Sequence, residues 1–470
     1  MLLGLAASWV GVASVAHAAS TDYWVPGGNG NWSSSTNWAG SRGGGSGRTV
    51  SSGDKPTFDF NSGVGTVNTT YDFSTAGFDL LGLQEYAGVS TVETFPNVVV
   101  NADSNNDAMT FTGNPPLRNE SNAMLTINTP VNFTGSVGVR VGAQTSGSTL
   151  VGATPGVIVL NGPRSLGGNM SVLGDAAPGS NTNPYGNLVI NGNISGSGDS
   201  VSVENGYSAS NYGYVELGGA NTFTGGVTID HAMLVVDNGT NGSATGSGTV
   251  TMAANDSAIG GTGTISGPIT PKGGISITAG GFLDPIANPA GGYRNFVNST
   301  GLLTLQSGLQ LAVGSANYVV TMNFDVNGSA ASQLAITGGT FAPSYGDTIN
   351  ISAGSKFTKS SYDLIDYAGS TVNFGNYASL GALVNTWTLN GAPTGWHLYN
   401  DAANNSIGIE AVPEPTTLGL FAGGVARCCW QAENVRCGFN SSLILTHCQG
   451  ESCHDNVLAT VWAGASGFGM

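Results

Sequence analysis

Cysteine is absent from residues 1–427, and positive charge is scarce throughout the chain. Of 470 residues, 12 are Lys or Arg and 28 are Asp or Glu, which gives a formal net charge of −16. Nucleic acids and anionic membranes both attract basic protein surfaces, so this composition argues against either partner. A body without cysteine must be stabilised by packing and hydrogen-bonded strands instead of disulfides.

The chain also lacks long segments in which apolar residues recur every 3.6 positions, as they do in an amphipathic helix. Hydrophobic residues nevertheless make up 40% of the sequence, and there are 74 glycines. The apolar residues form short runs, many of them β-branched, that are separated by Gly, Asn and Ser. This pattern is typical of many short strands joined by tight turns.

A loose repeat is present between about residues 120 and 280. The strand-like runs "LTIN", "IVLN" and "LVIN" end at Asn128, Asn161 and Asn191, and "VELG" ends at Gly218. The intervals of 33, 30 and 27 residues, obtained by subtracting these positions, indicate a solenoid in which each coil pairs with its neighbours. The alternative is coincidence in a sequence biased towards Gly, Asn and Val.

Residues 217–267 carry a more specific pattern. They contain "NTFTGG" at 221–226, "LVV" at 234–236, "SATG" at 243–246 and "GGTGTI" at 260–265, and we expect four short strands, in "NTFTGGVTI", "AMLVV", "GTVTM" and "GTGTISG". The order resembles the autotransporter-associated β-strand repeat of bacterial surface proteins. That resemblance implies a right-handed parallel β-helix. For the whole chain we expect an all-β fold with an irregular N-terminal β cap and a short disordered C-terminal tail.

The N-terminus has the features of an export signal. Residues 2–16 are apolar, and Ala16, His17 and Ala18 form a small-x-small motif, so cleavage is expected between Ala18 and Ala19. The alternative is a buried N-terminal strand or helix. Removal of residues 1–18 would place the mature chain outside the cytoplasm.

A second processing signal follows residue 410. The motif formed by Pro413, Glu414 and Pro415, followed by an apolar run, resembles the PEP-CTERM sorting signal of Gram-negative bacteria. The resemblance implies export, processing by an exosortase-type enzyme, and only transient membrane contact. The apolar run at 418–426 is shorter than the roughly 20 residues of a membrane span. It ends at Arg427 without an arginine cluster, so the signal is truncated.

Residues 428–470 differ in composition from the rest. Two interpretations stay open: a genuine cysteine-containing tail, or a reading-frame shift after Ala426. His447, Cys448, Cys453 and His454 could bind zinc, but CxxC spacing is absent, and disulfides are favoured. The cysteines of the tail are Cys428, Cys429, Cys437, Cys448 and Cys453.

Aromatic residues gather near both ends of the body. Trp24, Trp32 and Trp38 could form a sugar-stacking platform, but we favour a role in covering the open end of a β-structure. Aromatic residues near the other end are expected to close the last coil; they include Trp387, Trp396 and Tyr399.

Candidate catalytic and metal-binding residues are few. His231 follows Asp230 at an expected turn, where a surface histidine is favoured over a catalytic dyad because no oriented nucleophile is evident. Asp103, Asn105 and Asp107 alternate as in a calcium loop, but Gly and Glu are missing at the required positions, which favours a polar turn. We therefore expect no catalytic, cofactor-binding or metal-binding residues.

The expected organisation is a signal peptide at 1–18, a Trp/Gly-rich β region at 19–110, a β-helix at 111–410, a truncated sorting signal at 411–427 and a tail at 428–470. The expected function is that of a non-enzymatic, exported structural or adhesive protein of the cell surface or extracellular matrix. Expected partners are an exosortase-type enzyme and, by resemblance, exopolysaccharide or other surface proteins. The alternatives are a carbohydrate-active β-helix enzyme and an adhesin like an autotransporter passenger.

Overall fold

The computed structural model describes most of residues 20–412, together with two short strands of the tail. Contacts divide the chain into residues 1–412 and 413–470. In the second unit, β46 (Ile444–Leu445) pairs antiparallel with β47 (Val457–Leu458). Other residues of 1–19 and 413–470 are outside the described part, as are 26–28, 42–43, 59–65, 74–78, 81–82, 86–95, 113–116, 120, 122, 143–144, 147–148, 151–155, 176–186, 206–213, 240–241, 255–256, 273, 281–299, 314–315, 318 and 353–354.

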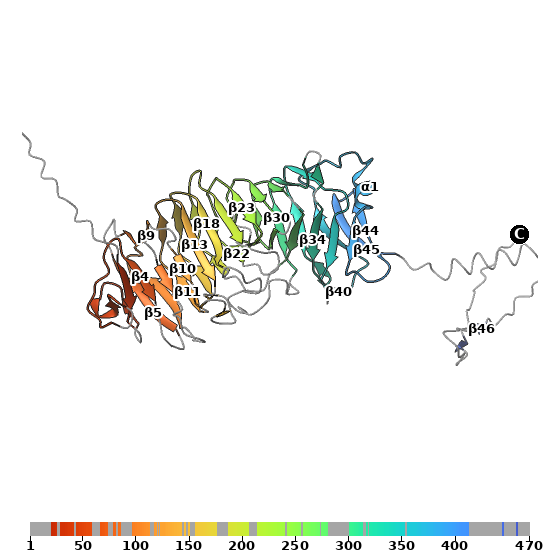
Figure 1. Ribbon diagram of the computed structural model, residues 1–470. Helices are drawn as coiled ribbons and strands as arrows, with labels where there is room; N and C mark the ends of the chain where they lie inside the picture. Colours follow the sequence, from red (N-terminus) through yellow and green to blue (C-terminus); the bar gives the residue numbers. More distant parts are fainter. Residues whose placement is uncertain are drawn as a thin grey trace, which may run out of the picture. The chain divides into compact units, whose positions relative to one another are not determined.

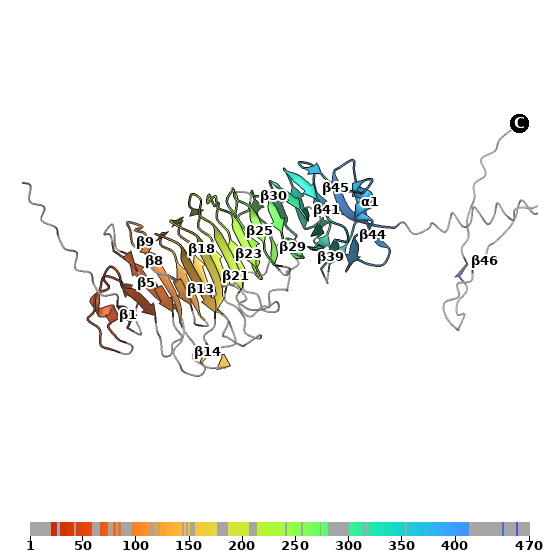
Figure 2. The same cartoon turned by 45° about the horizontal axis from the view of Figure 1, so that its top comes forward.

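Residues 20–412 form a parallel β-helix, in which most coils contribute one strand to each of three faces (Figures 1 and 2). One coil contains β10 (Leu117–Asn119), β11 (Met124–Ile127) and β12 (Val131–Phe133). The chain then enters β13 (Val137–Gly142), which pairs in parallel with β10. The all-β, parallel β-helix expected from the sequence is confirmed.

The first two faces are long sheets, here named sheet A and sheet B. Sheet A runs in the order β3 (Trp38–Ala39), β1 (Thr21–Trp24), β4 (Lys55–Phe58), β7 (Leu83–Glu85), β10, β13, β18 (Met170–Asp175), β21 (Val201–Asn205), β23 (Val227–Asp230), β25 (Val250–Met252), β28 (Ile269–Pro271), β31 (Gly308–Gln310), β38 (Thr340–Ala342) and β42 (Thr371–Val372). Sheet B runs in the order β2 (Gly30–Asn31), β5 (Thr66–Tyr71), β8 (Asn97–Ala102), β11, β16 (Val157–Leu160), β19 (Asn187–Ile190), β22 (Tyr214–Leu217), β24 (Met233–Val236), β26 (Ala258–Gly261), β29 (Ile275–Ala279), β34 (Val320–Phe324), β39 (Thr348–Ile351) and β43 (Thr388–Asn390).

The third face consists of two shorter sheets, and further short strands and helices lie outside the three faces. Its first sheet contains β6 (Asp79–Leu80), β9 (Met109–Phe111), β12, β17 (Arg164–Leu166) and β20 (Ile194–Ser195). Its second contains β27 (Thr264–Ile265), β30 (Leu302–Leu305), β37 (Gln333–Ile336), β41 (Ser361–Asp366), β45 (Ser406–Ala411) and β44 (Trp396–Asp401). The small elements are β14 (Thr145–Ser146), β15 (Thr149–Leu150), β32 (Ala312–Val313), β33 (Ala316–Asn317), β35 (Val326–Gly328), β36 (Ala330–Ala331), β40 (Lys356–Phe357), the 3-10 helix η1 (Ser35–Asn37) and the helix α1 (Leu380–Val384).

The sequence repeat corresponds to one position in successive coils. Ile127, Leu160, Ile190 and Leu217 are aligned on neighbouring strands of sheet B, and all four are buried in the core. Stacking such side chains removes apolar surface from water, at about 1.5–3 kcal/mol for each large aliphatic side chain. The repeat is therefore the signature of the core of the β-helix.

An asparagine ladder follows the same strands. The Asn161 side-chain amide donates to the Asn128 side-chain oxygen at 2.8 Å, and Asn191 donates to Asn161 at 2.9 Å. Asn128 in turn donates to Asn101 at 2.8 Å. The asparagines that end each run in the sequence thus connect four coils at one corner.

The segment 221–226 differs from the expectation of a strand. Between β20 and β27 the third face of the β-helix is built from hydrogen-bonded turns. The Asn221 amide donates to the Ser243 carbonyl at 2.7 Å, and the Ala244 amide donates to the Thr264 carbonyl at 2.8 Å. Gly226 has a φ of 88°, and a Cβ there would lie 2.3 Å from the Thr249 carbonyl oxygen. The strand therefore begins only at Val227, after the corner that this glycine makes.

Candidate functional site

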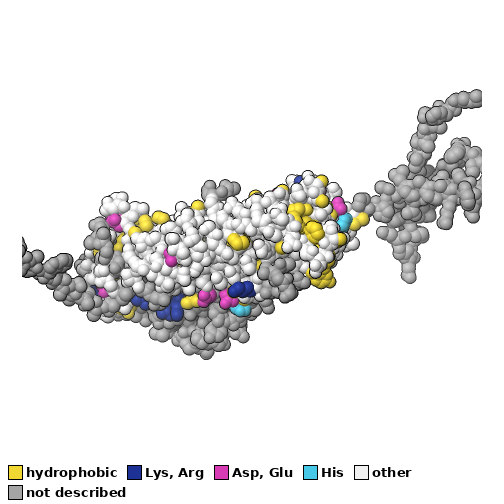
Figure 3. All heavy atoms as spheres, turned by 90° about the horizontal axis from the view of Figure 1, so that it is seen from above, with side chains coloured by type: hydrophobic (Ala, Val, Ile, Leu, Met, Phe, Trp, Pro, Cys, Tyr) yellow, Lys and Arg dark blue, Asp and Glu magenta, His cyan; other side chains and the backbone are white. Residues whose placement is uncertain are grey.

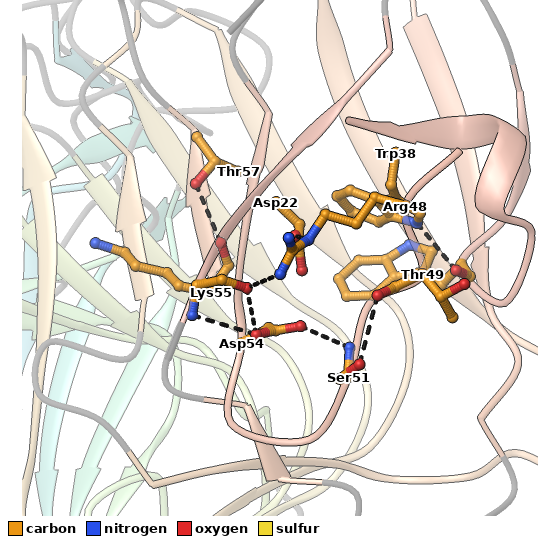
Figure 4. Close-up of polar contacts among 10 residues, drawn as sticks. Asp22, Trp38, Arg48, Thr49, Ser51, Asp54, Lys55 and Thr57 are labelled. Atoms are coloured by element: carbon orange, nitrogen blue, oxygen red, sulfur yellow. Dashed lines mark hydrogen bonds and ion pairs between the residues drawn. The ribbon is translucent and has the colours of Figure 1, made fainter. Parts of the chain in front are cut away.

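Two carboxyl groups meet inside the N-terminal cap. Asp22 lies on β1, and Asp54 directly precedes β4, which pairs in parallel with β1. Arg48, from the connecting loop, reaches Asp22 and forms an ion pair between its Nε and Asp22 Oδ1 (Figure 4). Asp22 and Asp54 are both fully buried. The fold thus brings together charged residues that lie in separate parts of the sequence.

Asp54 is held by hydrogen bonds from the neighbouring backbone and side chains. Its Oδ1 accepts from the Ser20 amide at 3.2 Å and from the Ser20 hydroxyl at 2.5 Å. Its Oδ2 accepts from the Ser51 amide at 2.7 Å. Arg48 donates through Nη2 to the Ser20 hydroxyl, so that serine connects the arginine to Asp54.

The two carboxyl groups titrate differently. Burial, followed by the hydrogen bond and repulsion from Asp54, raises the pKa of Asp22 to about 7, although Arg48 opposes this. Burial also acts to raise the pKa of Asp54, but hydrogen bonds from Ser20, Asp22 and Ser51 outweigh it and hold that pKa below its usual value. The pair therefore shares a proton around neutral pH.

A shared proton is also a property of catalytic carboxyl pairs, but a catalytic acid or base must reach its substrate. Asp22 is 0% exposed and Asp54 is 1% exposed, so neither carboxyl group can contact a molecule in solution. This cluster therefore acts on the fold: it places the partly exposed Arg48 beside two buried carboxyl groups where the first coils begin. It is a stabilising centre of the cap.

The three N-terminal tryptophans pack beside this cluster. Trp24 and Trp38 meet edge-to-face at 4.8 Å between ring centroids, and Trp32 contacts Trp38 in the same way at 5.3 Å. The Trp32 indole N–H donates to the Thr69 hydroxyl at 3.1 Å. Their exposed fractions are between 0% and 2%, so the sugar-platform interpretation is wrong and the covering role is supported.

His231 lies at the exposed corner between β23 and β24. Its φ is 50°, its side chain is 50% exposed, and its Nε2 lies 3.8 Å from Asp230 Oδ1. That distance is too long for a direct hydrogen bond. The structure places the pair on the surface, as the sequence favoured.

The segment around Asp103 forms a polar turn. Asp103 Oδ1 accepts from the Asn105 amide at 3.0 Å, and Oδ2 accepts from the Asn105 side chain at the same distance. Asn106 completes the turn with a φ of 56°. Among the described residues, no group of three or more His, Cys, Asp or Glu side chains is arranged to hold a metal ion.

The last coils contain a different buried carboxyl group. Asp347 accepts from the Val320 amide at 3.0 Å, the Ser344 hydroxyl at 2.7 Å and the Ser344 amide at 3.0 Å. Burial raises its pKa to about 6 despite these donors. The Trp387 indole N–H donates to the Ser344 carbonyl at 3.0 Å, so Trp387 holds this loop against the end of the β-helix.

Trp396 and Tyr399 lie on β44, the outer strand of the third face at this end. The Trp396 ring is 4.8 Å from Phe357 and 5.8 Å from Tyr362, and the Tyr399 hydroxyl donates to Asp363 at 3.1 Å. These contacts attach β44 to the preceding coils, as expected for residues that close the last coil.

Sheet A presents two ordered rows of side chains on its outer surface, and sequence reasoning missed both. The hydroxyl row consists of Ser171, Ser202, Thr228, Thr251 and Thr270, aligned on consecutive strands. The charged row consists of Arg118, Arg140, Leu173, Glu204 and Asp230, also aligned on consecutive strands. Alternation within "LRN", "VSVEN" and "VTID" could have indicated which residues point outward.

Several expected sites fall outside the described residues: Ala18 and Ala19 at the signal cleavage position, Pro413, Glu414 and Pro415 of the sorting motif, and the cysteines and histidines of the tail. No family model, curated protein or solved structure matches this chain. In the part of the chain that the structure describes, no helix is long and apolar enough to span a membrane. The family resemblances stay predictions.

Proposed function

We propose that this chain is an exported, non-enzymatic structural or adhesive protein of the cell surface or extracellular matrix. The observation that carries the proposal is the long β-helix with repeated, uncharged polar rows on its outside. The hydroxyl row extends over five strands of sheet A, and the ladder from Asn101 to Asn191 joins four coils of sheet B. Such a surface suits extended partners better than small molecules.

The positions of the expected processing sites support export of the β-helix as a unit. Among the described residues, the first strand, β1, begins at Thr21, after the expected cleavage between Ala18 and Ala19. The unit ends at Val412, directly before Pro413. Processing at both positions, by a signal peptidase and an exosortase-type enzyme, would leave every strand of the β-helix intact.

Exopolysaccharide is the partner that we propose for the hydroxyl row. Neighbouring strands are about 4.8 Å apart, so the row offers hydroxyl oxygens at a constant short interval. The Ser202 hydroxyl donates to Glu204 Oε1 at 2.6 Å, which leaves its oxygen as an acceptor. Sugar hydroxyls can exchange hydrogen bonds with such groups directly or through water. Each contact is weak, and many contacts along one polymer would add up.

Cosedimentation with matrix polysaccharide and with envelope fractions tests this function. We expect binding by the unaltered chain and weaker binding by the triple variant Ser202→Ala, Thr228→Val, Thr251→Val. The matched control replaces hydroxyls of sheet B, Thr321→Val and Thr348→Val, and should bind normally. Absence of binding to both fractions would contradict the proposal, as would release of reducing ends or unsaturated products from a polysaccharide panel, which would indicate an enzyme.

A further inference from the structure

In the charged row of sheet A, basic and acidic side chains are separated by sign along the sheet, which solubility alone does not require. Arg118 aligns with Arg140, and Glu204 aligns with Asp230, so like charges lie directly opposite each other on neighbouring strands. Like charges in such pairs repel each other. All five side chains of the row are partly exposed. In Figure 3, dark blue, yellow and magenta side chains follow one another along one part of the surface, and a further dark blue and a cyan side chain come next.

The row is antisymmetric about its centre. Leu173 aligns with Arg140 on one side and with Glu204 on the other. Reading along the sheet, the order is therefore basic, basic, apolar, acidic, acidic. With strands about 4.8 Å apart, the row extends over roughly 19 Å. Reversing the row places each basic position opposite an acidic one.

We propose that this face binds a second copy of the chain in an antiparallel, two-fold symmetric dimer. Because the hydroxyl row lies two residues away on the same strands, this dimer and polysaccharide binding to that row exclude each other. The two-fold axis would run parallel to the strands, between the two Leu173 side chains. Arg118 of each copy then faces Asp230 of the other, and Arg140 faces Glu204. An isologous interface requires this self-complementarity, because each contact must occur twice.

The charge of the chain supports a second copy over other partners. A formal net charge of −16 makes chains repel one another, so self-association needs a local arrangement that overcomes the repulsion. The charged row provides four attractive pairs around an apolar centre and has no net charge itself. A basic or acidic partner would match only one half of the row and be repelled by the other.

Sedimentation equilibrium of the purified chain tests the proposal. The unaltered chain should approach twice the monomer mass as concentration rises, and the dissociation constant should increase when salt is raised. The variant Arg118→Glu, Arg140→Glu makes the row wholly acidic, and the variant Glu204→Arg, Asp230→Arg makes it wholly basic. Each variant alone should dissociate more than about tenfold more readily than the unaltered chain.

Mixing the two variants provides the decisive comparison. Each acidic row then faces a basic row in both halves of the interface, so the mixture should recover a dimer, which also shows that both variants fold. The control Lys356→Glu, Lys359→Glu makes the same charge change elsewhere and should leave dimerisation intact. A monomeric unaltered chain at on the order of 100 µM, or a mixture that stays monomeric, would overturn the proposal.

Discussion

The two ends of the β-helix are closed in different ways. At the N-terminal end, three buried indole rings lie in the first coils, together with the buried Asp22 and Asp54 and the partly exposed Arg48. At the C-terminal end, β41, β45 and β44 continue the third face as antiparallel strands, and α1 packs beside β44. The first end depends on the packing of large side chains and on buried carboxyl groups, whereas the second adds antiparallel strand pairing to its side-chain contacts.

This difference indicates which end is more sensitive to single substitutions and to pH. Exposed strand edges and open ends of a solenoid must be covered, and both solutions achieve it. A cap that depends on a few large side chains loses much when one is truncated. A cap that depends on strand pairing loses little, because backbone bonds persist after substitution. The N-terminal end should therefore respond more strongly to single substitutions and to pH.

The largest contrast is expected for tryptophan truncation. Trp38→Ala removes a fully buried indole and should lower the free energy of unfolding by about 3–5 kcal/mol. Trp396→Ala removes a partly exposed indole at the other end and should cost clearly less. Urea denaturation followed by circular dichroism measures both values. Equal losses would show that the two ends do not differ in the manner described.

At pH 7, substitution of a buried carboxyl group should destabilise the protein more at the C-terminal end than at the N-terminal end. Asp347 accepts three hydrogen bonds, and Asp347→Asn turns an acceptor into a donor that faces donors, which should cost about 1–3 kcal/mol. Asp22→Asn resembles the protonated acid, which is well populated near its pKa of about 7, and should change stability little. Thermal melts of the two variants at pH 7 compare them, and a greater loss in Asp22→Asn would contradict shared protonation in the cap.

The pH dependence of stability should follow Asp22. Because its pKa is raised in the fold, from 3.8 to about 7, its stabilising contribution is complete below pH 3.8 and is lost as pH rises through about 7. Asp22→Asn should therefore flatten the melting-temperature profile between those values. Asp401→Asn is the control, since hydrogen bonds from Asn404 and Ala403 lower the pKa of Asp401 and confine its effect to more acidic solutions. An unchanged profile in Asp22→Asn would refute the assignment.

The smallest effect is expected at an exposed ion pair of the C-terminal end. His397 Nε2 lies 3.1 Å from Glu410 Oε1 on paired strands, and both side chains are almost half exposed. His397→Ala should cost between about 0 and 1 kcal/mol at pH 6. Arg48→Ala removes the contacts with the buried Asp22 and with the Ser20 hydroxyl and should cost more. Chemical denaturation of both variants at low salt makes the comparison. A larger loss of unfolding free energy in His397→Ala would mean that an ion pair between side chains also stabilises the C-terminal end.

The repeat and the fold class were predictable from sequence because one coil recurs in the chain. Asn128, Asn161 and Asn191 mark the same corner, and the apolar residue before each of them is in the core. The segment 221–226 was mispredicted as a strand because its Asn and Gly residues build turns that replace strands on the third face. The covering role of the tryptophans followed from how much surface an indole buries.

The cap cluster and the charged row could not be predicted in the same way. Asp22 and Asp54 are 32 positions apart, and only the parallel pairing of β1 with β4 brings them together. Arg140 and Leu173 are aligned only after a connection whose length differs from coil to coil. Arg164 occupies an inward position beside Val131 and Ile194, where sequence patterns favour an apolar residue. Because the loops differ in length, the strand register that aligns these residues cannot be read from their spacing in the sequence.

Peptide mass spectrometry of the native protein in envelope, culture medium and cytoplasm tests export of the processed β-helix most directly. Export predicts a mature N-terminus at Ala19, recovery from the envelope or the medium, and a C-terminus near Pro415. Recovery from the cytoplasm alone, with residues 1–18 still attached and the tail peptides around Cys437 intact, would contradict the proposed function.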